Sequence, residues 1–182
     1  MIRQLAQFAR PLLDIPAVRR TRRNHGLEHA TITLLSRRVR GLRIAGRSSQ
    51  HGFVLIGDAP TAEIERAAAE ALRRMQGGER QLALHPNCGT NLLTTGMLTS
   101  LVGLFGFGGA VRRPTADRFA WIMLLMMLAS LAAQPLGMRL QEHFTTSGDP
   151  GDLEIVSVVR REVRWPLASE PVVLHHVNTT RG

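Results

Sequence analysis

The residues best suited to chemistry lie within five positions, in the sequence His25-Gly26-Leu27-Glu28-His29. Residues four apart in a helix share one face, so His25 and His29 can both point at one metal ion. Glu28 lies next to His29 and about one turn from His25, where its carboxylate can polarise a water molecule on that ion. The alternative is that these polar side chains only form the solvated face of a helix.

A second group, His85-Pro86-Asn87-Cys88, precedes a long apolar segment. It places a histidine and the single cysteine of the chain three residues apart in a turn-forming sequence, and both are ligands that zinc prefers. The alternative is a capping turn, in which Asn87, Thr90 or Asn91 caps the following helix. The two interpretations are compatible, because a capped loop also holds ligands rigidly.

Together the two groups predict one zinc site. His25 and His29 bind the ion from a helix, and His85, Cys88 or both complete the ligand set from the loop. If three of these residues bind and Glu28 does not, water takes the fourth position and hydrolysis is possible. If all four bind, the site is closed and structural. The spacing H-x-x-E-H is that of inverted zincins, in which two histidines bind zinc and the glutamate is the general base.

Two apolar segments, residues 92–111 and 119–138, each contain twenty residues without a charged side chain. A helix of that length spans about 30 Å, the thickness of the hydrocarbon core of a bilayer. Only seven residues, 112–118, join them, so the sequence predicts an antiparallel transmembrane hairpin. The alternative is a pair of buried helices in a soluble protein, but a chain of 182 residues has little else to cover them.

The remaining sequence predicts short strands and two amphipathic helices. We expect helices at 21–40 and 61–76, the second capped by Thr61 and ended by Gly77-Gly78. We expect strands at 41–46, 51–58, 80–84 and 153–159, with a turn at 47–50. The fold class is therefore α+β, a small sheet with two covering helices, interrupted by the transmembrane hairpin.

The chain is predicted to have four parts. These are a basic amphipathic N-terminal segment (1–20), a soluble α+β domain with both motifs (21–91), the hairpin (92–138), and a C-terminal strand and tail (139–182). Beyond Arg160 the pattern is weak, so no further strand is expected there and the tail is predicted to be partly disordered.

The distribution of charged residues in the sequence predicts which partners the protein binds. All 23 basic residues are arginine, the formal net charge is +9, and residues 1–50 hold eleven arginines against two acidic residues. Such a block prefers anionic surfaces, and beside a membrane hairpin these are lipid headgroups. Nucleic acid is not expected as a partner, because aromatic residues make up 4% of the chain and tyrosine is absent. A single cysteine excludes an intramolecular disulfide.

The combination of HGLEHATI and HPNCGTNLL resembles a family of uncharacterised small bacterial membrane proteins, a domain of unknown function. It is also similar to the YqhQ-like membrane proteins, which have H-G-x-E-H-x-x-I, then H-P-x-C-G-T and apolar helices. The resemblance covers residues 24–32 and 85–93, the hairpin, and for the closer family TTSGDPGDL. It implies a shared site without implying a reaction. We expect the bacterial inner membrane, with the arginine-rich soluble part on the cytoplasmic side.

The leading functional hypothesis is a membrane-bound zinc-dependent hydrolase, a peptidase acting at the bilayer surface with Glu28 as its catalytic base. One alternative is a membrane scaffold or accessory subunit, in which the His/Cys site is structural and the hairpin packs against other membrane helices. Another is a thiol hydrolase with Cys88 as nucleophile and His85 or His25 as base. His143 is either an additional ligand or proton carrier, or an ordinary interfacial histidine.

Overall fold

The computed structural model of the chain describes residues 2–108, 115–164 and 171–182. It divides into two compact units. The first consists of Met1–His85 and Glu142–Gly182, and the second of Pro86–Gln141. The group His85–Cys88 falls at this division, whereas His25–His29 lies within the first unit, and each unit is described separately.

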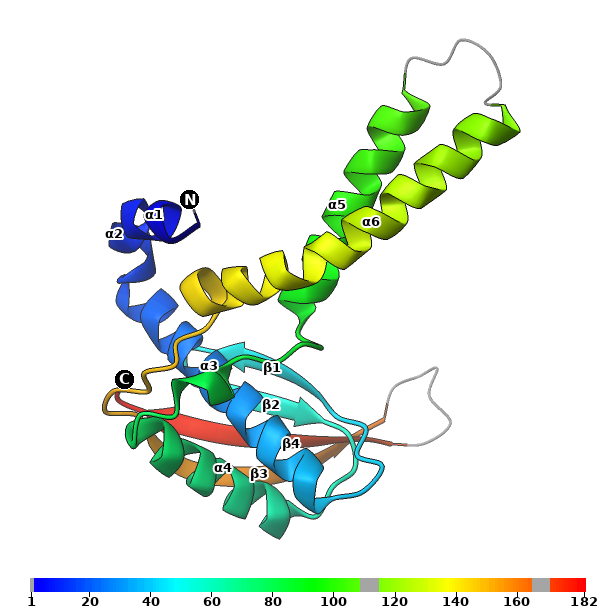
Figure 1. Cartoon of the computed structure of the whole chain (residues 1–182). Helices are drawn as coiled ribbons and strands as arrows, with labels where there is room; N and C mark the ends of the chain where they lie inside the picture. The colour runs from blue at the N-terminus through cyan, green and yellow to red at the C-terminus, as the bar shows by residue number, and fades with distance from the viewer. Residues whose placement is uncertain (1, 109–114, 165–170) are drawn as a thin grey trace. The chain divides into compact units, whose positions relative to one another are not determined.

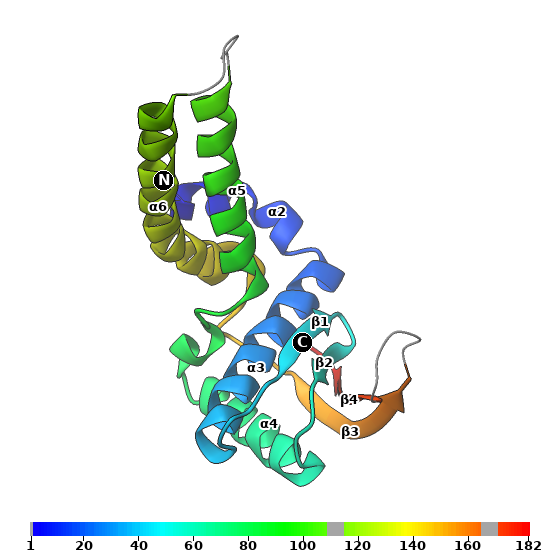
Figure 2. The same ribbon diagram turned by 90° about the vertical axis from the view of Figure 1, so that its right-hand side faces the viewer.

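The first unit is a small antiparallel sheet with helices on one face (Figures 1 and 2). The four strands lie in the order β1-β2-β4-β3, and α3 and α4 pack on the sheet and on each other. This confirms the predicted α+β class with two covering helices. Its elements are α1 (Ile2–Phe8), α2 (Arg10–Leu13), α3 (Pro16–Arg38), β1 (Ala45–Ser49), β2 (Gly52–Ile56), α4 (Thr61–Gln76), the 3₁₀ helix η1 (Arg80–Ala83), β3 (Glu154–Val163) and β4 (Val172–Thr180).

The core of this unit forms where α3 and α4 meet the sheet. Three alanines of α4 are fully buried, and their small side chains let the two helices approach closely. Leucines of α3 and apolar residues of β2 and β4 fill the remaining space. The residues concerned are Ala67, Ala68 and Ala71 in α4, Leu27 and Leu35 in α3, Phe53 and Leu55 in β2, and Val177 in β4.

Several predicted boundaries hold and others are wrong. The helix α4 begins and ends where expected, although Pro60 occupies its N-cap and Thr61 is its first residue. The helix α3 starts at Pro16, earlier than predicted, because proline suits the first turn of a helix. The first strand lies at Ala45–Ser49 and not at 41–46, since its register pairs Ala45 with Ile56 and Ser49 with Gly52.

Two predictions about strands are wrong, because packing and pairing with other segments determine the structure there. Residues 80–83 form the 3₁₀ helix η1 in place of the expected strand, and this turn buries the adjacent Leu82 and Ala83. The tail beyond Arg160, expected to lack a strand, continues β3 to Val163 and contains the whole of β4. β4 is bonded to the neighbouring strand β3 on one side and to β2, which lies far earlier in the sequence, on the other.

The second unit is a pair of antiparallel helices, α5 (Gly89–Phe107) and α6 (Ala116–Leu140) (Figure 1). Both helices are long and apolar enough to cross a membrane. Many of their large apolar side chains are exposed, among them Phe105 at 78% and Leu131 at 71%. A water-soluble protein rarely exposes so continuous an apolar surface. Of the predicted link at 112–118, residues 112–114 lie outside the described residues, Thr115 is the N-cap of α6, and 116–118 form its first turn.

Close contacts join the two helices of this unit. A Cβ atom on Gly137 would lie 2.2 Å from the Asn91 Oδ1 atom, so only glycine allows this approach. The Asn91 side chain donates to the Pro86 carbonyl at 2.7 Å, and Gln141 donates to Asn91 Oδ1 at 2.9 Å. Through Asn91, these two bonds tie Pro86, which precedes α5, to Gln141, which directly follows α6.

The strand β4 contains a histidine whose burial predicts a pH dependence. His175 is fully buried, and neither ring nitrogen has a hydrogen-bond partner among the described residues. Burial, with a smaller effect from Arg160, lowers the pKa of His175 below its ordinary value of 6.5. The unfolded chain therefore binds a proton first as the pH falls, and stability declines below about pH 6.5.

We predict that His175→Leu reduces this loss of stability on acidification, because leucine binds no proton in either state. The measurement is the unfolding temperature of the full chain in detergent at pH 7.5 and at lower pH. The control is His176→Leu, the next residue of β4, whose side chain is not fully buried. An equal decline for the wild type and the His175 variant would contradict the prediction.

Candidate metal centre

The helix α3 places His25 and His29 next to each other, as the four-residue spacing predicts. Their ring centroids are 4.4 Å apart, and one nitrogen of each ring lies within 4.8 Å of the other. His29 is buried and His25 is partly buried. Between them, Gly26 lets the backbone of Ser147 approach, because a Cβ atom there would lie 2.1 Å from the Ser147 carbonyl oxygen.

Each of these two rings is held by a backbone carbonyl from a distant part of the sequence. His25 Nδ1 bonds to the Thr145 carbonyl at 2.9 Å, and His29 Nδ1 bonds to the Ala83 carbonyl at 2.8 Å. A carbonyl oxygen only accepts, so each Nδ1 atom carries the proton and donates. In a neutral ring the lone pair is then on Nε2. This is the arrangement of metal-binding histidines, whose second nitrogen donates to a carbonyl or carboxylate.

A third ring lies beside this pair. The ring centroid of His85 is 5.8 Å from that of His29, and His85 follows η1 by two residues. The 3₁₀ turn thus supplies both the carbonyl that orients His29 and, two residues later, a further imidazole. Within the first unit the structure therefore brings together three of the predicted site residues.

Cys88 belongs to the second unit, where it is the N-cap of α5. Its Sγ atom accepts a hydrogen bond from the Thr90 amide at 3.5 Å. The expectation that Asn87, Thr90 or Asn91 caps this helix is wrong, because the cysteine occupies the cap. Cys88 follows His85 by three positions, a length of chain that spans at most about 11 Å between Cα atoms.

Glu28 lies against the sheet. Its carboxylate accepts a hydrogen bond from the Ser48 hydroxyl, and the residue is only 4% exposed. A Cβ atom on Gly46 would lie 2.1 Å from Glu28 Oε1, so the absence of a side chain there makes room for the carboxylate. Ser48 and Gly46 were not predicted as part of a site, because only the packing of α3 on the sheet brings β1 next to Glu28.

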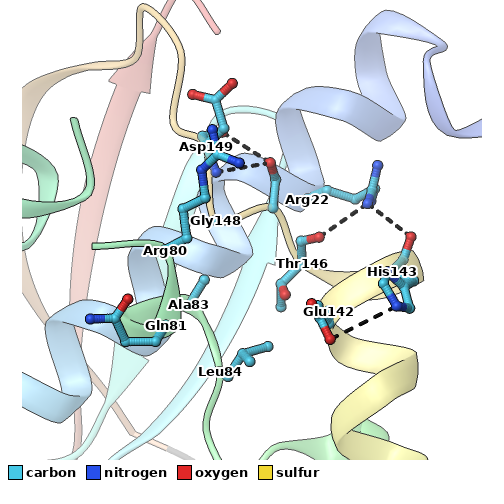
Figure 3. Close-up of a pocket in the computed structure, with 11 residues that line it drawn as sticks. Arg22, Arg80, Gln81, Ala83, Leu84, Glu142, His143, Thr146, Gly148 and Asp149 are labelled. Carbon is cyan, nitrogen blue, oxygen red and sulfur yellow. Dashed lines mark hydrogen bonds and ion pairs between the residues drawn. The ribbon is translucent and has the colours of Figure 1, made fainter. Parts of the chain in front are cut away.

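A cleft of about 390 Å³ runs along this part of the first unit (Figure 3). Ala83, whose carbonyl bonds His29, forms part of its wall, and so does Thr146, next to the residue that bonds His25. Its lining residues are Arg22, Arg80, Gln81, Ala83, Leu84, Glu142, His143, Thr146, Ser147, Gly148 and Asp149.

Three charged or titratable side chains are notable in this cleft. The Arg22 guanidinium donates through Nη2 to the His143 and Thr146 carbonyls, both at 3.1 Å. The His143 Nε2 atom lies 3.8 Å from the Glu142 carboxylate. Both residues belong to the π-helical turn η2 (Gln141–Thr145), a rare geometry that is often found at functional sites. Neither Arg22 nor Glu142 was predicted, because no local motif marks them.

These observations define the class of the protein. It is an α+β protein with a candidate histidine metal centre and two helices that are able to span a membrane. A family model described as "Domain of unknown function (DUF6391)" matches residues 20–158, and the chain belongs to this family.

A curated relative is also similar. It is an uncharacterized protein of Picosynechococcus sp. (strain ATCC 27264 / PCC 7002 / PR-6), 32% identical over 149 residues. The match covers 69% of this chain and 65% of the relative, so the chain spans about two thirds of that protein's length. No solved structure matches.

We predict that His29→Ala lowers the metal content of the purified chain by at least tenfold, because it removes one ligand and its anchoring bond. Elemental analysis of the wild type and the variant provides the measurement. His51→Ala is the matched control, since His51 is exposed in the turn between β1 and β2. Equal metal content in the His29 variant and the control would contradict the assignment.

Proposed function

We propose that the protein is a membrane-bound zinc-dependent hydrolase, and most simply a peptidase that acts at the bilayer surface. The observation that best supports this is the pair of carbonyl bonds to the Nδ1 atoms of His25 and His29. These bonds place the lone pair of each neutral ring on Nε2, one of the two nitrogens through which histidine binds metals.

We further propose that Cys88, His85 or both complete the ligand set. His25, His29 and Cys88 are ligand types that can hold a metal ion together, and a thiolate with two imidazoles suits zinc. The short chain between His85 and Cys88 keeps the thiol within reach of the histidines. Three protein ligands would leave one coordination position for water.

A zinc ion at this site would supply Lewis acidity and make a water molecule acidic enough to attack a carbonyl group near neutral pH. In this proposal Glu28 is the general base that accepts the proton of that water. The same residue then returns the proton to the leaving amine as the peptide bond breaks. The neighbouring cleft gives an extended substrate a place to bind.

We also propose that the helices α5 and α6 cross the bacterial inner membrane and that the soluble unit lies on the cytoplasmic side. The apolar and exposed surfaces of these helices support a membrane location. Arginines at 73, 74, 80 and 139, near the ends of the two segments, favour the cytoplasmic side. The relationship to YqhQ-like proteins remains a prediction.

A second candidate function is a structural metal site in a membrane scaffold or accessory subunit. The burial of Glu28 and its bond to Ser48 favour this alternative, because a general base must reach water. In that case the ion would be closed to substrate, and α5 and α6 would pack against the helices of other membrane proteins. The small residues of α5, such as Gly96, suit close helix packing.

The thiol-hydrolase alternative has less support. Cys88 is 7% exposed and its sulfur caps α5, whereas reactive cysteines are partly accessible. Alkylation of Cys88 would abolish activity in a thiol enzyme.

The decisive variant is Glu28→Gln. It keeps a hydrogen-bond acceptor for Ser48 but removes the base, so we expect wild-type metal content with at least a hundredfold loss of peptidase activity. Activity is measured on a mixture of peptides in detergent, and metal by elemental analysis. Ser48→Ala is the control for the buried bond and should retain most activity. Equal peptidase activity in Glu28→Gln and the wild type would exclude the catalytic proposal.

A further inference from the structure

A second cavity of about 470 Å³ lies in the first unit, where α1, α2 and the start of α3 face the segment that follows α6. Five arginines line it against three acidic residues, so the lining carries two more positive than negative charges. The arginines are Arg3, Arg10, Arg19, Arg22 and Arg23, and the acidic residues are Asp14, Glu142 and Asp149.

The positive charge of this cavity is poorly balanced within the protein. Arg23 forms an ion pair with Asp152 at 3.6 Å, but among the described residues Arg3, Arg10 and Arg19 form none. The Nε atom of Arg22 is buried without a hydrogen-bond partner in the described part of the chain. Burial lowers the pKa of Arg22. A bound anion would supply both the missing acceptor and the missing negative charge.

The few residues between the apolar part of α6 and the cavity wall determine how deep that wall lies relative to a membrane. Glu142 and His143 form part of its wall, and they follow α6 directly. Glu142 is four residues beyond Met138, the end of the apolar segment, which is about 6 Å along a helix. The headgroup layer on each side of a bilayer is about 5–7 Å thick. If α6 crosses the membrane, this wall of the cavity lies at the depth of the lipid phosphates.

The helices that contribute these arginines also expose apolar side chains. Leu5 is 55% exposed, Phe8 89% and Leu12 62%. Within the same short segment, Arg3 and Arg10 line the cavity. Apolar side chains beside arginines are typical of a helix that lies in the membrane interface.

We propose that this cavity binds the phosphate group of an anionic phospholipid. Arg10 and Arg19 contact the phosphate, Arg22 supplies its buried Nε atom, and the apolar side chains of α1 and α2 enter the bilayer surface. The proposal requires that α5 and α6 cross the membrane, but it does not depend on a metal ion or on hydrolysis. It assigns the arginine-rich N-terminal segment a defined lipid site.

The test uses the full chain in a neutral detergent, titrated with short-chain phosphatidylglycerol and followed by native mass spectrometry. The variant is the double substitution Arg10→Gln, Arg19→Gln. Its matched control, Arg40→Gln, Arg43→Gln, removes the same charge from exposed positions outside the cavity. We expect the control to bind as the wild type does, and the cavity variant to bind at least tenfold more weakly.

Three results would overturn the proposal. These are equal weakening in both double variants, equal retention of phosphatidylcholine and phosphatidylglycerol, and displacement of the lipid by inorganic phosphate at an equal concentration. The last would show a site for free phosphate. Unfolding temperatures measured without lipid test whether both double variants are folded. Because both should keep wild-type metal content, a failed lipid site is distinguishable from a failed metal site.

Discussion

The candidate metal centre depends on two hydrogen bonds that join α3 to distant parts of the chain. His25 bonds the Thr145 carbonyl and His29 bonds the Ala83 carbonyl, across sequence separations of 120 and 54 residues. Each bond fixes a ring, selects its tautomer and satisfies a backbone oxygen. Without these carbonyls the two histidines would be ordinary polar residues on a helix, so the local chemistry is a consequence of the tertiary fold.

Two glycines make this arrangement possible. Gly26 allows the backbone of Ser147 to approach α3, just after the segment that anchors His25, and Gly46 leaves room in β1 for the carboxylate of Glu28. A methyl group at Gly26 would overlap the Ser147 carbonyl, and one at Gly46 would overlap the Glu28 carboxylate. Gly26 in the H-G-x-E-H motif and Gly46 in β1 therefore both make room for neighbouring atoms at this site. The segment that approaches Gly26 lies far away in the sequence, beyond α5 and α6.

The sequence was sufficient to predict what depends on local pattern. The spacing of His25 and His29, the apolar segments of α5 and α6, and the boundaries of α4 all follow from helix periodicity. The sequence was insufficient where contacts between distant residues determine the structure. β4 forms between two other strands, η1 buries adjacent residues, and the partners of Glu28 and the two histidines come from distant segments. Arg22 and Glu142 line the cleft for the same reason, since folding alone brings them together.

The most direct test of the account is X-ray absorption at the zinc edge on the purified full-length chain. The account predicts about one zinc ion per chain, bound by at least two imidazole nitrogens at about 2.0–2.1 Å and, if Cys88 is a ligand, by one sulfur at about 2.3 Å. Loss of the nitrogen signal in His29→Ala would link that ion to α3. A chain that binds no metal, or that holds zinc through oxygen ligands alone, would contradict the central claim.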